Sequence, residues 1–392
     1  MILLKGDGAI VTGFFSLEKD LAQKINKLKE MSRGFSERAK EIDESASFPF
    51  DNVKELQESG YTSLTIPKEF GGQEISLYEM VRLQEVIAQG DGSTALSIGW
   101  HMGIVRNIQE ANWNKDTLRE IYEKLLTGSL INGAATEPQT GSPTRGGKPH
   151  TTAEKKGEDW VINGHKTFTT MSPVLDYFLV TASIKDTDNV GNFLIPKECR
   201  GIRIENTWDS IALRGTGSND VYFENVEIPA RYFVEKLDSR KKINPWLLHI
   251  PACYLGIAGA AQKEAVTFAK NYSPNSIKGT ISDIPSVRSK IGDIELKMQT
   301  AKHFLYSVSK KWDEANKEQQ SHMQPELSAV KLVATNTAIE VVDMAMRIVG
   351  ARSLSAKSPL QRYYRDVRAG LHNPPMDDMT LDQLAQKSIN EY

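Results

Sequence analysis

The stretch KKGEDWVINGHKTFTT, residues 155–170, is the most informative part of this chain for its fold class. Its apolar positions are β-branched or aromatic, and glycine and asparagine interrupt them, which is typical of short antiparallel strands. The Asn163-Gly164 pair reads as a hairpin turn, and the following Phe168-Thr169-Thr170 as the start of a second strand. This part of the chain is therefore predicted to be a β-structure built from short strands.

Similar runs continue across residues 133–235, at Tyr177–Thr181, Asn192–Ile195 and Asp220–Phe223. Several short strands at this spacing predict a small barrel or sandwich. A parallel Rossmann sheet is not expected, because the strands do not alternate with helices.

Helical periodicity flanks the strand region on both sides. Before it, Ser16 is a candidate cap for a helix beginning near Leu17, and a short helix is expected to end at Gly60. After it, apolar residues recur at spacings of four and three along two segments separated by Pro325, which predicts an antiparallel helical bundle. The expected class is α+β multidomain, with domain boundaries near residues 132 and 240.

The composition excludes several classes of partner. Lys+Arg 48 against Asp+Glu 50 gives a net charge of −2, whereas nucleic-acid-binding proteins carry a clustered basic excess. The two cysteines, Cys199 and Cys253, cannot form a disulfide framework or a four-ligand zinc site, and they suit a reducing cytoplasm. No segment reaches the roughly 18 apolar residues that cross a bilayer. We expect a cytoplasmic protein without a nucleic-acid or membrane partner, whose first 15 residues form a poorly packed extension.

The common catalytic motifs are missing. The seven histidines include no pair at the i, i+4 spacing of zinc proteases, so no metal site is predicted. Gly215–Asp220 begins like GxGxxG but leads into a strand, and Gly256-Ile-Ala-Gly259 is more typical of close helix packing. A Walker loop and a GxSxG elbow are also absent.

Two stretches can carry binding chemistry. Residues 134–142, AATEPQTGS, form a loop whose backbone N–H groups and hydroxyls suit an anionic or carbonyl-rich ligand. In the second stretch, Phe168 beside Thr169 and Thr170 offers a ring that can stack on a planar group and hydroxyls that can bond its edge. On residue types alone, an ordinary strand with a polar turn is the favoured explanation of the second stretch.

Six motifs in this order resemble the acyl-CoA dehydrogenase family of flavoproteins over roughly 320 residues. They are IPKEFGG (66–72), TEPQTGS (136–142), NGHKTFTT (163–170), LRGTGS (213–218), VYFENVEIP (221–229) and QRYYRD (361–366). The resemblance implies an N-terminal α-helical domain (1–132), a central β-barrel domain (133–240) and a C-terminal four-helix bundle domain (241–392). It also implies a homotetramer in which the flavin lies between barrel and bundle.

The resemblance also implies site residues. Flavin contacts are expected from the residues that match the family's two flavin loops and from a late arginine and glycine: Thr136, Pro138, Gly141, Ser142, Phe168, Thr169, Thr170, Arg347 and Gly350. Ser142 and Arg214 are expected to contact the substrate, an acyl-CoA thioester. FAD is the expected cofactor and an electron-transfer flavoprotein the expected partner.

The chain departs from the family where the catalytic base is expected. Most members carry a glutamate shortly after the Arg-Asp pair, and here Pro374 falls at about that place. A minority carry a glutamate early in the first bundle helix, and the matching segment 244–249 contains no carboxylate. Asp377 or Asp378 is the candidate for a displaced base.

The cofactor motifs depart as well. The family's RxxFG is replaced by residues 270–275, KNYSPN, and its QIxGGxG by residues 347–353, RIVGARS. The loss of these pyrophosphate contacts leaves FMN as an alternative to FAD.

These departures leave two alternatives to a dehydrogenase. Flavin monooxygenases of the dibenzothiophene-monooxygenase type are similar in architecture, take reduced flavin from a partner reductase, form a C4a-peroxyflavin and need no α-proton base. The resemblance places His101, Ser172 and His372 at the positions of their active-site residues. The second alternative is a non-catalytic family member that binds an acyl thioester or a flavin. The expected activity is α,β-dehydrogenation of an acyl-CoA with hydride transfer to flavin, in fatty acid metabolism.

Overall fold

The structure is a computed structural model of the 392-residue chain, and it describes residues 3–4, 10–12, 15–111, 113–140, 147–237 and 243–392. Its helices are α1 (Lys19–Ser45), α2 (Phe50–Glu58), α3 (Leu77–Gly90), α4 (Gly92–Glu110), α5 (Lys115–Leu126), α6 (His249–Asn271), α7 (Pro285–Glu314), α8 (Lys317–Ser321), α9 (Gln324–Val349), α10 (Pro359–Asp366) and α11 (Asp377–Glu391). Its strands are β1 (Leu3–Leu4), β2 (Ile10–Thr12), β3 (Phe15–Leu17), β4 (Ile131–Ala134), β5 (Thr152–Lys156), β6 (Asp159–Thr169), β7 (Tyr177–Ile184), β8 (Val190–Pro196), β9 (Ile202–Glu205), β10 (Asn219–Pro229) and β11 (Phe233–Leu237).

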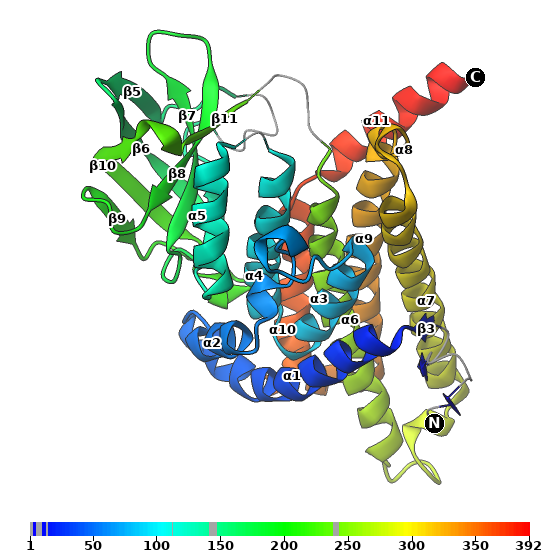
Figure 1. The fold of residues 1–392 in the computed structure, drawn as a ribbon. Helices are drawn as coiled ribbons and strands as arrows, with labels where there is room; N and C mark the ends of the chain where they lie inside the picture. Colours follow the sequence, from blue (N-terminus) through cyan, green and yellow to red (C-terminus); the bar gives the residue numbers. More distant parts are fainter. Residues whose placement is uncertain (1–2, 5–9, 13–14, 112, 141–146, 238–242) are drawn as a thin grey trace. The chain divides into compact units, whose positions relative to one another are not determined.

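The chain forms two compact units, each built from separate stretches of sequence. One comprises residues 1–41, 76–95 and 248–392, and the other comprises residues 42–75 and 96–247. The first is helical apart from a small N-terminal sheet, and the second contains the large sheet (Figure 1). The three expected domain ranges stay a prediction.

The α+β class is confirmed, but a closed barrel is not formed. The large sheet runs in the order β11-β8-β7-β5-β6-β10-β9, with β4 paired to β7, and among the described residues its two edge strands do not pair with each other. Most neighbours are antiparallel, whereas β7 pairs in parallel with β4 and β5. The sheet is therefore open and mixed.

The hairpin predicted at Asn163-Gly164 is wrong, because both residues lie inside the single strand β6. The turn falls at Gly157, whose φ is 61°, between β5 and β6. Glycine is required at 164 for a different reason, since a Cβ there would lie 2.3 Å from the Thr151 hydroxyl. The Asn163 side chain accepts a hydrogen bond from the backbone of Asn225 on β10.

The start of the chain also differs from expectation. Leu17 lies in β3, which pairs with β2 in a three-stranded sheet, and the first long helix begins at Lys19. The predicted short helix is confirmed as α2, followed by Gly60 at φ 78°.

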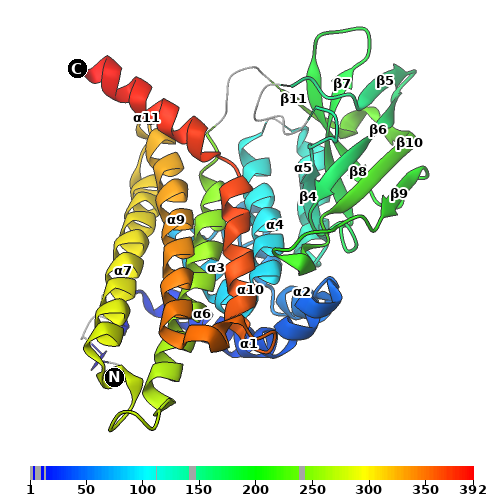
Figure 2. The ribbon, with the colours of Figure 1, turned by 180° about the vertical axis from the view of Figure 1, so that it is seen from behind.

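The helical unit is organised around α6, which packs against α3, α7 and α9 (Figure 2). Pro325 stands in the first turn of α9, where its missing N–H costs nothing. The predicted seam residues that are buried are Ile294, Met298, Ala301, Leu305, Val308, Val330, Ala334, Val341 and Ile348. The other four predicted seam residues are only partly buried: Val287, Ile291, Thr337 and Met344. The described helices are too short or too polar to span a membrane.

The contact between α3 and α6 depends on Gly256. A Cβ at this position would lie 2.5 Å from the Glu85 carbonyl oxygen and 2.6 Å from the Ala88 Cβ. At Gly259, one turn later, the nearest atoms would be 3.8 Å and 3.9 Å away. The two glycines therefore have different roles on one helix.

We expect Gly256→Ala to lower the free energy of unfolding by about 1–3 kcal/mol, because α3 and α6 must separate. Gly259→Ala is the matched control, and its better helix propensity should leave stability unchanged or raise it by up to about 1 kcal/mol. Urea unfolding followed by circular dichroism measures both. Equal losses for the two variants would contradict the close-packing role of Gly256.

Candidate functional site

A strained turn lies at the C-terminal end of β6 in the sheet-containing unit. Phe168 and Met171 have φ values of 54° and 66°, in the left-handed region that bulky residues rarely adopt. The Thr170 N–H donates to the Phe168 carbonyl (2.9 Å), and the Met171 N–H donates to the Thr216 carbonyl (3.0 Å). Such outliers persist only where surrounding structure enforces them, and they cluster at ligand sites.

The turn exposes an aromatic ring next to buried hydroxyls. Phe168 is 61% exposed, whereas Thr169 is fully buried and Thr170 nearly so. The Thr169 hydroxyl oxygen has no hydrogen-bond partner within the described chain. An accessible ring beside a buried polar atom fits a planar ligand that has polar edge atoms.

A chain of hydroxyls joins two of the sequence motifs. The Thr170 Oγ1 lies 2.9 Å from the Ser218 Oγ, which donates to the Thr216 Oγ1 at 2.9 Å. Asn132 on β4 donates its side-chain amide to the Thr170 carbonyl at 2.8 Å. Thr216, Ser218 and Asn132 are not among the predicted site residues, although Thr216 and Ser218 lie in the LRGTGS motif.

A buried ion pair anchors the loop that follows β4. The Lys166 Nζ lies 2.7 Å from the Glu137 Oε1, and the exposed fractions of the two side chains are 0% and 3%. Glu137 also accepts the backbone N–H groups of His150 (2.6 Å) and Thr151 (2.9 Å). Its carboxylate therefore joins the loop at 136–140, β6 and the start of β5.

The pair is ionised despite its burial. Burial raises the pKa of Glu137, but the hydrogen bonds from Lys166, Thr151 and the backbone outweigh it and hold that pKa at about 2. Burial lowers the pKa of Lys166, and Glu137 opposes this effect. Both residues lie in the quoted motifs, yet residue types alone did not reveal that they bind each other.

The other expected ligand contacts in this unit differ in their exposure and in their hydrogen bonds. Thr136 is half-buried and its carbonyl accepts the Thr167 N–H, whereas Pro138 is exposed. Gly141 and Ser142 lie outside the described residues. Arg214 donates from Nε to the Asp43 carbonyl (2.7 Å) and from Nη1 to the Ser210 carbonyl (3.3 Å), so its guanidinium already serves the protein backbone.

His101 and Ser172 are buried and bonded to backbone. The Ile131 N–H donates to the His101 Nδ1 (3.1 Å), and the His101 Nε2 lies 3.0 Å from the Thr62 carbonyl oxygen. Burial lowers the pKa of His101 to about 4, so its ring is neutral at physiological pH. Ser172 donates its hydroxyl to the Gly217 carbonyl at 3.0 Å. The polar atoms of both side chains thus tie the protein's own segments together, and their catalytic roles stay predictions.

The remaining catalytic candidates belong to the helical unit. His372 is exposed at the end of the 3-10 helix η9 (Val367–His372), and Asp378 is exposed in the first turn of α11. Asp377 is held by two donors, the Lys331 Nζ (3.1 Å) and the Asn336 Nδ2 (3.0 Å), both on α9. The Lys331 side chain is 2% exposed, and burial lowers its pKa while Asp377 opposes that shift.

The expected phosphate contacts lie at the other end of α9. Arg347 is 69% exposed and lies 3.9 Å from Asp343. Gly350 follows the helix with a φ of 70°. Both residues are exposed to solvent.

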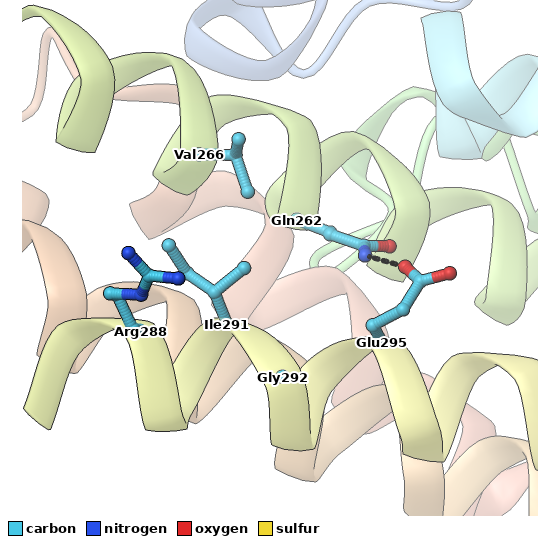
Figure 3. Close-up of a pocket in the computed structure, with 6 residues that line it drawn as sticks. All are labelled: Gln262, Val266, Arg288, Ile291, Gly292 and Glu295. Atoms are coloured by element: carbon cyan, nitrogen blue, oxygen red, sulfur yellow. Dashed lines mark hydrogen bonds between the residues drawn. The ribbon is translucent and has the colours of Figure 1, made fainter. Parts of the chain in front are cut away.

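A surface groove on the helical unit is distinct from all of these residues. It holds about 550 Å³ between α6 and α7 and is lined by Gln262, Val266, Arg288, Ile291, Gly292 and Glu295 (Figure 3). The Gln262 amide donates to Glu295 across it at 2.6 Å. None of the predicted site residues lines this groove.

Comparisons with known proteins agree along most of the chain. Residues 25–128, 132–226 and 248–373 match the N-terminal, middle and C-terminal domains of acyl-CoA dehydrogenase. A Bacillus subtilis (strain 168) protein named "Putative acyl-CoA dehydrogenase YdbM" is 48% identical over 94% of this chain and 97% of its own length.

Two solved structures share the fold. Butyryl-CoA dehydrogenase from Megasphaera elsdenii matches with a TM-score of 0.85 at 18% identity, covering 96% of this chain and 100% of its own. FMN-bound TdsC from Paenibacillus sp. A11-2 matches with a TM-score of 0.84 at 22% identity, covering 94% and 98%.

We expect Lys166→Met to lower the free energy of unfolding by about 3–5 kcal/mol, because it leaves the Glu137 carboxylate buried without its cation. Lys148→Met is the matched control. Lys148 pairs with Asp188 at 3.4 Å on the surface, and loss of such a pair costs at most about 1 kcal/mol. Urea unfolding at neutral pH measures both, and similar losses would contradict the anchoring role of Lys166.

The pair also makes a pH-dependent contribution to stability. Because folding depresses the pKa of Glu137 from its ordinary 4.5 to about 2, the contribution is complete above about pH 4.5 and is lost as the pH falls toward 2. The stability of Glu137→Gln should therefore fall less steeply than that of the wild type across this range. Parallel curves would refute the assignment.

Proposed function

Because the chain belongs to the acyl-CoA dehydrogenase family of flavin-dependent oxidoreductases, we propose that it is an acyl-CoA dehydrogenase that oxidises the α,β-bond of an acyl-CoA thioester. The observation that carries the proposal is the strained turn at Phe168, with its exposed ring and its chain of hydroxyls. We propose that this turn is a flavin contact.

The residues of the turn fit a flavin. The exposed face of Phe168 can stack on its ring system, and the Thr170 hydroxyl can bond a ring nitrogen while Ser218 and Thr216 hold that hydroxyl in place. When bound, a flavin supplies the acceptor for the hydride that leaves the β-carbon of the substrate.

We assign the removal of the α-proton to Asp377. Lys331 and Asn336 each donate to one of its two carboxylate oxygens, which fixes the orientation of the carboxylate. Its side chain remains 32% exposed, so it is accessible to a ligand. Asp378, its neighbour in the chain, is exposed, and no hydrogen bond from the described residues fixes its carboxylate, which favours a solvated role.

His372 favours a second candidate function, a reduced-flavin-dependent monooxygenase. Of His101, Ser172 and His372, only His372 is exposed. The other two side chains are buried and hydrogen-bonded to backbone groups. An accessible imidazole can accept or donate a proton. TdsC, which shares the fold, was solved with FMN.

We further propose FAD as the cofactor, an electron-transfer flavoprotein as the electron acceptor, a homotetrameric assembly and a cytoplasmic location in fatty acid metabolism. The exposed Arg347 and the adjoining Gly350 support a phosphate contact at the end of α9. If the protein is a monooxygenase, FMN replaces FAD as the cofactor and a flavin reductase replaces the electron-transfer flavoprotein as the partner.

We expect the purified protein, loaded with FAD or FMN, to lose its visible flavin absorbance when a saturated acyl-CoA is added without oxygen. A panel of acyl chain lengths identifies the substrate class. If every acyl-CoA leaves the flavin oxidised while reduced flavin, oxygen and an aromatic thioether or indole give an oxygenated product, the monooxygenase is correct. A protein that binds neither flavin is a non-catalytic family member.

We expect Asp377→Asn to slow the acyl-CoA-dependent bleaching by about 10²–10⁴-fold, because the amide cannot accept the α-proton. Asp378→Asn is the matched control and should retain the wild-type rate. His372→Ala should change the bleaching little, whereas in a monooxygenase it should abolish oxygenation. A slow Asp378 variant beside a normal Asp377 variant would reverse the assignment.

A further inference from the structure

We propose that Trp208 is a positioning residue, which fixes the ring of Phe168 so that one of its faces stays open for the flavin. The inference rests on the proposed flavin contact at Phe168. It concerns a residue outside every motif quoted for this chain, in the loop between β9 and the 3-10 helix η4 (Arg214–Thr216).

The two rings meet at nearly a right angle. Their centroids are 6.1 Å apart and their planes are inclined by 85°, which is the edge-to-face arrangement that aromatic pairs favour. A perpendicular contact occupies at most one face of the Phe168 ring. The other face remains accessible, in agreement with the 61% exposure of this residue.

Phe168 needs such support because little else holds it. The side chain is mostly in solvent, and its backbone is in the left-handed region, where a phenylalanine is strained. A solvent-exposed ring samples several rotamers, and ordering it on binding would reduce affinity. A rigid neighbour removes part of that cost in advance.

Trp208 is itself anchored at both of its N–H groups. Its backbone N–H donates to the Asn219 Oδ1 (3.1 Å), and its indole Nε1 donates to the Leu213 carbonyl (3.3 Å). Leu213 has a φ of 50° and precedes η4, which contains Thr216 of the hydroxyl chain. The indole therefore connects the Phe168 ring with the same loop that holds the Thr170 hydroxyl.

The test is a double-mutant cycle on flavin binding, with variants Phe168→Leu, Trp208→Leu and the double variant. The affinity of each apoprotein for FAD, and for FMN, is measured by quenching of flavin fluorescence, and the induced circular dichroism of the bound flavin is recorded. Trp208→Phe keeps an aromatic edge but loses the indole donor. Trp160→Phe is the matched control, because this tryptophan packs against Phe193 and Phe233 at the opposite end of β6.

We expect Trp208→Leu to weaken flavin binding by about three- to tenfold and to alter the flavin dichroism. In the Phe168→Leu background the same substitution should have no further effect, because Trp208 acts through the ring. Trp208→Phe should recover part of the loss, and Trp160→Phe should leave both signals unchanged. Equal effects of Trp208→Leu in both backgrounds, or none in either, would overturn the proposal.

A readout without flavin separates this inference from the proposed function. Fluorine NMR of 4-fluorophenylalanine at position 168 reports the surroundings of the ring in the apoprotein. We expect Trp208→Leu to shift and narrow this resonance, while Trp160→Phe leaves it in place. If Trp208→Leu shifts the resonance but the wild-type protein binds no flavin, the ring contact is upheld and the flavin role is rejected. If Trp208→Leu leaves the resonance in place, the contact itself is rejected.

Discussion

The buried pair of Glu137 and Lys166 is the interaction on which the rest of the candidate flavin contact depends. Two opposite charges with almost no exposure are tolerated only when every donor and acceptor is satisfied, and here two backbone N–H groups complete the carboxylate. Lys166 stands two residues before Phe168 on β6, and Glu137 immediately follows Thr136. The loop after β4 and the end of β6 are thereby locked together, so neither expected contact segment can move without breaking the pair.

The fold class and its helical and β regions could be predicted from the sequence, because periodicity is a local property. The α9 start at Pro325 and the α2 end near Gly60 follow from single-residue preferences. The turn predicted at Asn163-Gly164 is wrong because the conformation of this pair is not a local property. The pair has the composition of a turn, but close approach of Thr151 and a bond to Asn225 hold it inside a strand, and both depend on residues far along the chain.

The residues of the candidate site divide in the same way, into those that a local motif identifies and those that depend on distant partners. Phe168 and Thr170 can be named as candidates because they stand in a recognisable motif, and their roles stay predictions. Trp208 and Lys331 cannot, since each acts through a partner 40 or more residues away. His101 was named from its position in the chain. Only the structure shows that both of its ring nitrogens are engaged by backbone groups of β4 and of the 3-10 helix Tyr61–Ser63.

The left-handed backbone at Phe168 has a consequence for protein design. Glycine adopts this conformation without strain, so Phe168→Gly would relieve the backbone strain at this position. The large, exposed aromatic ring at this position is therefore not the residue that backbone fit alone would favour. Stabilising design on this scaffold that judges residues by backbone fit alone would therefore remove the side chain that we propose as a flavin contact.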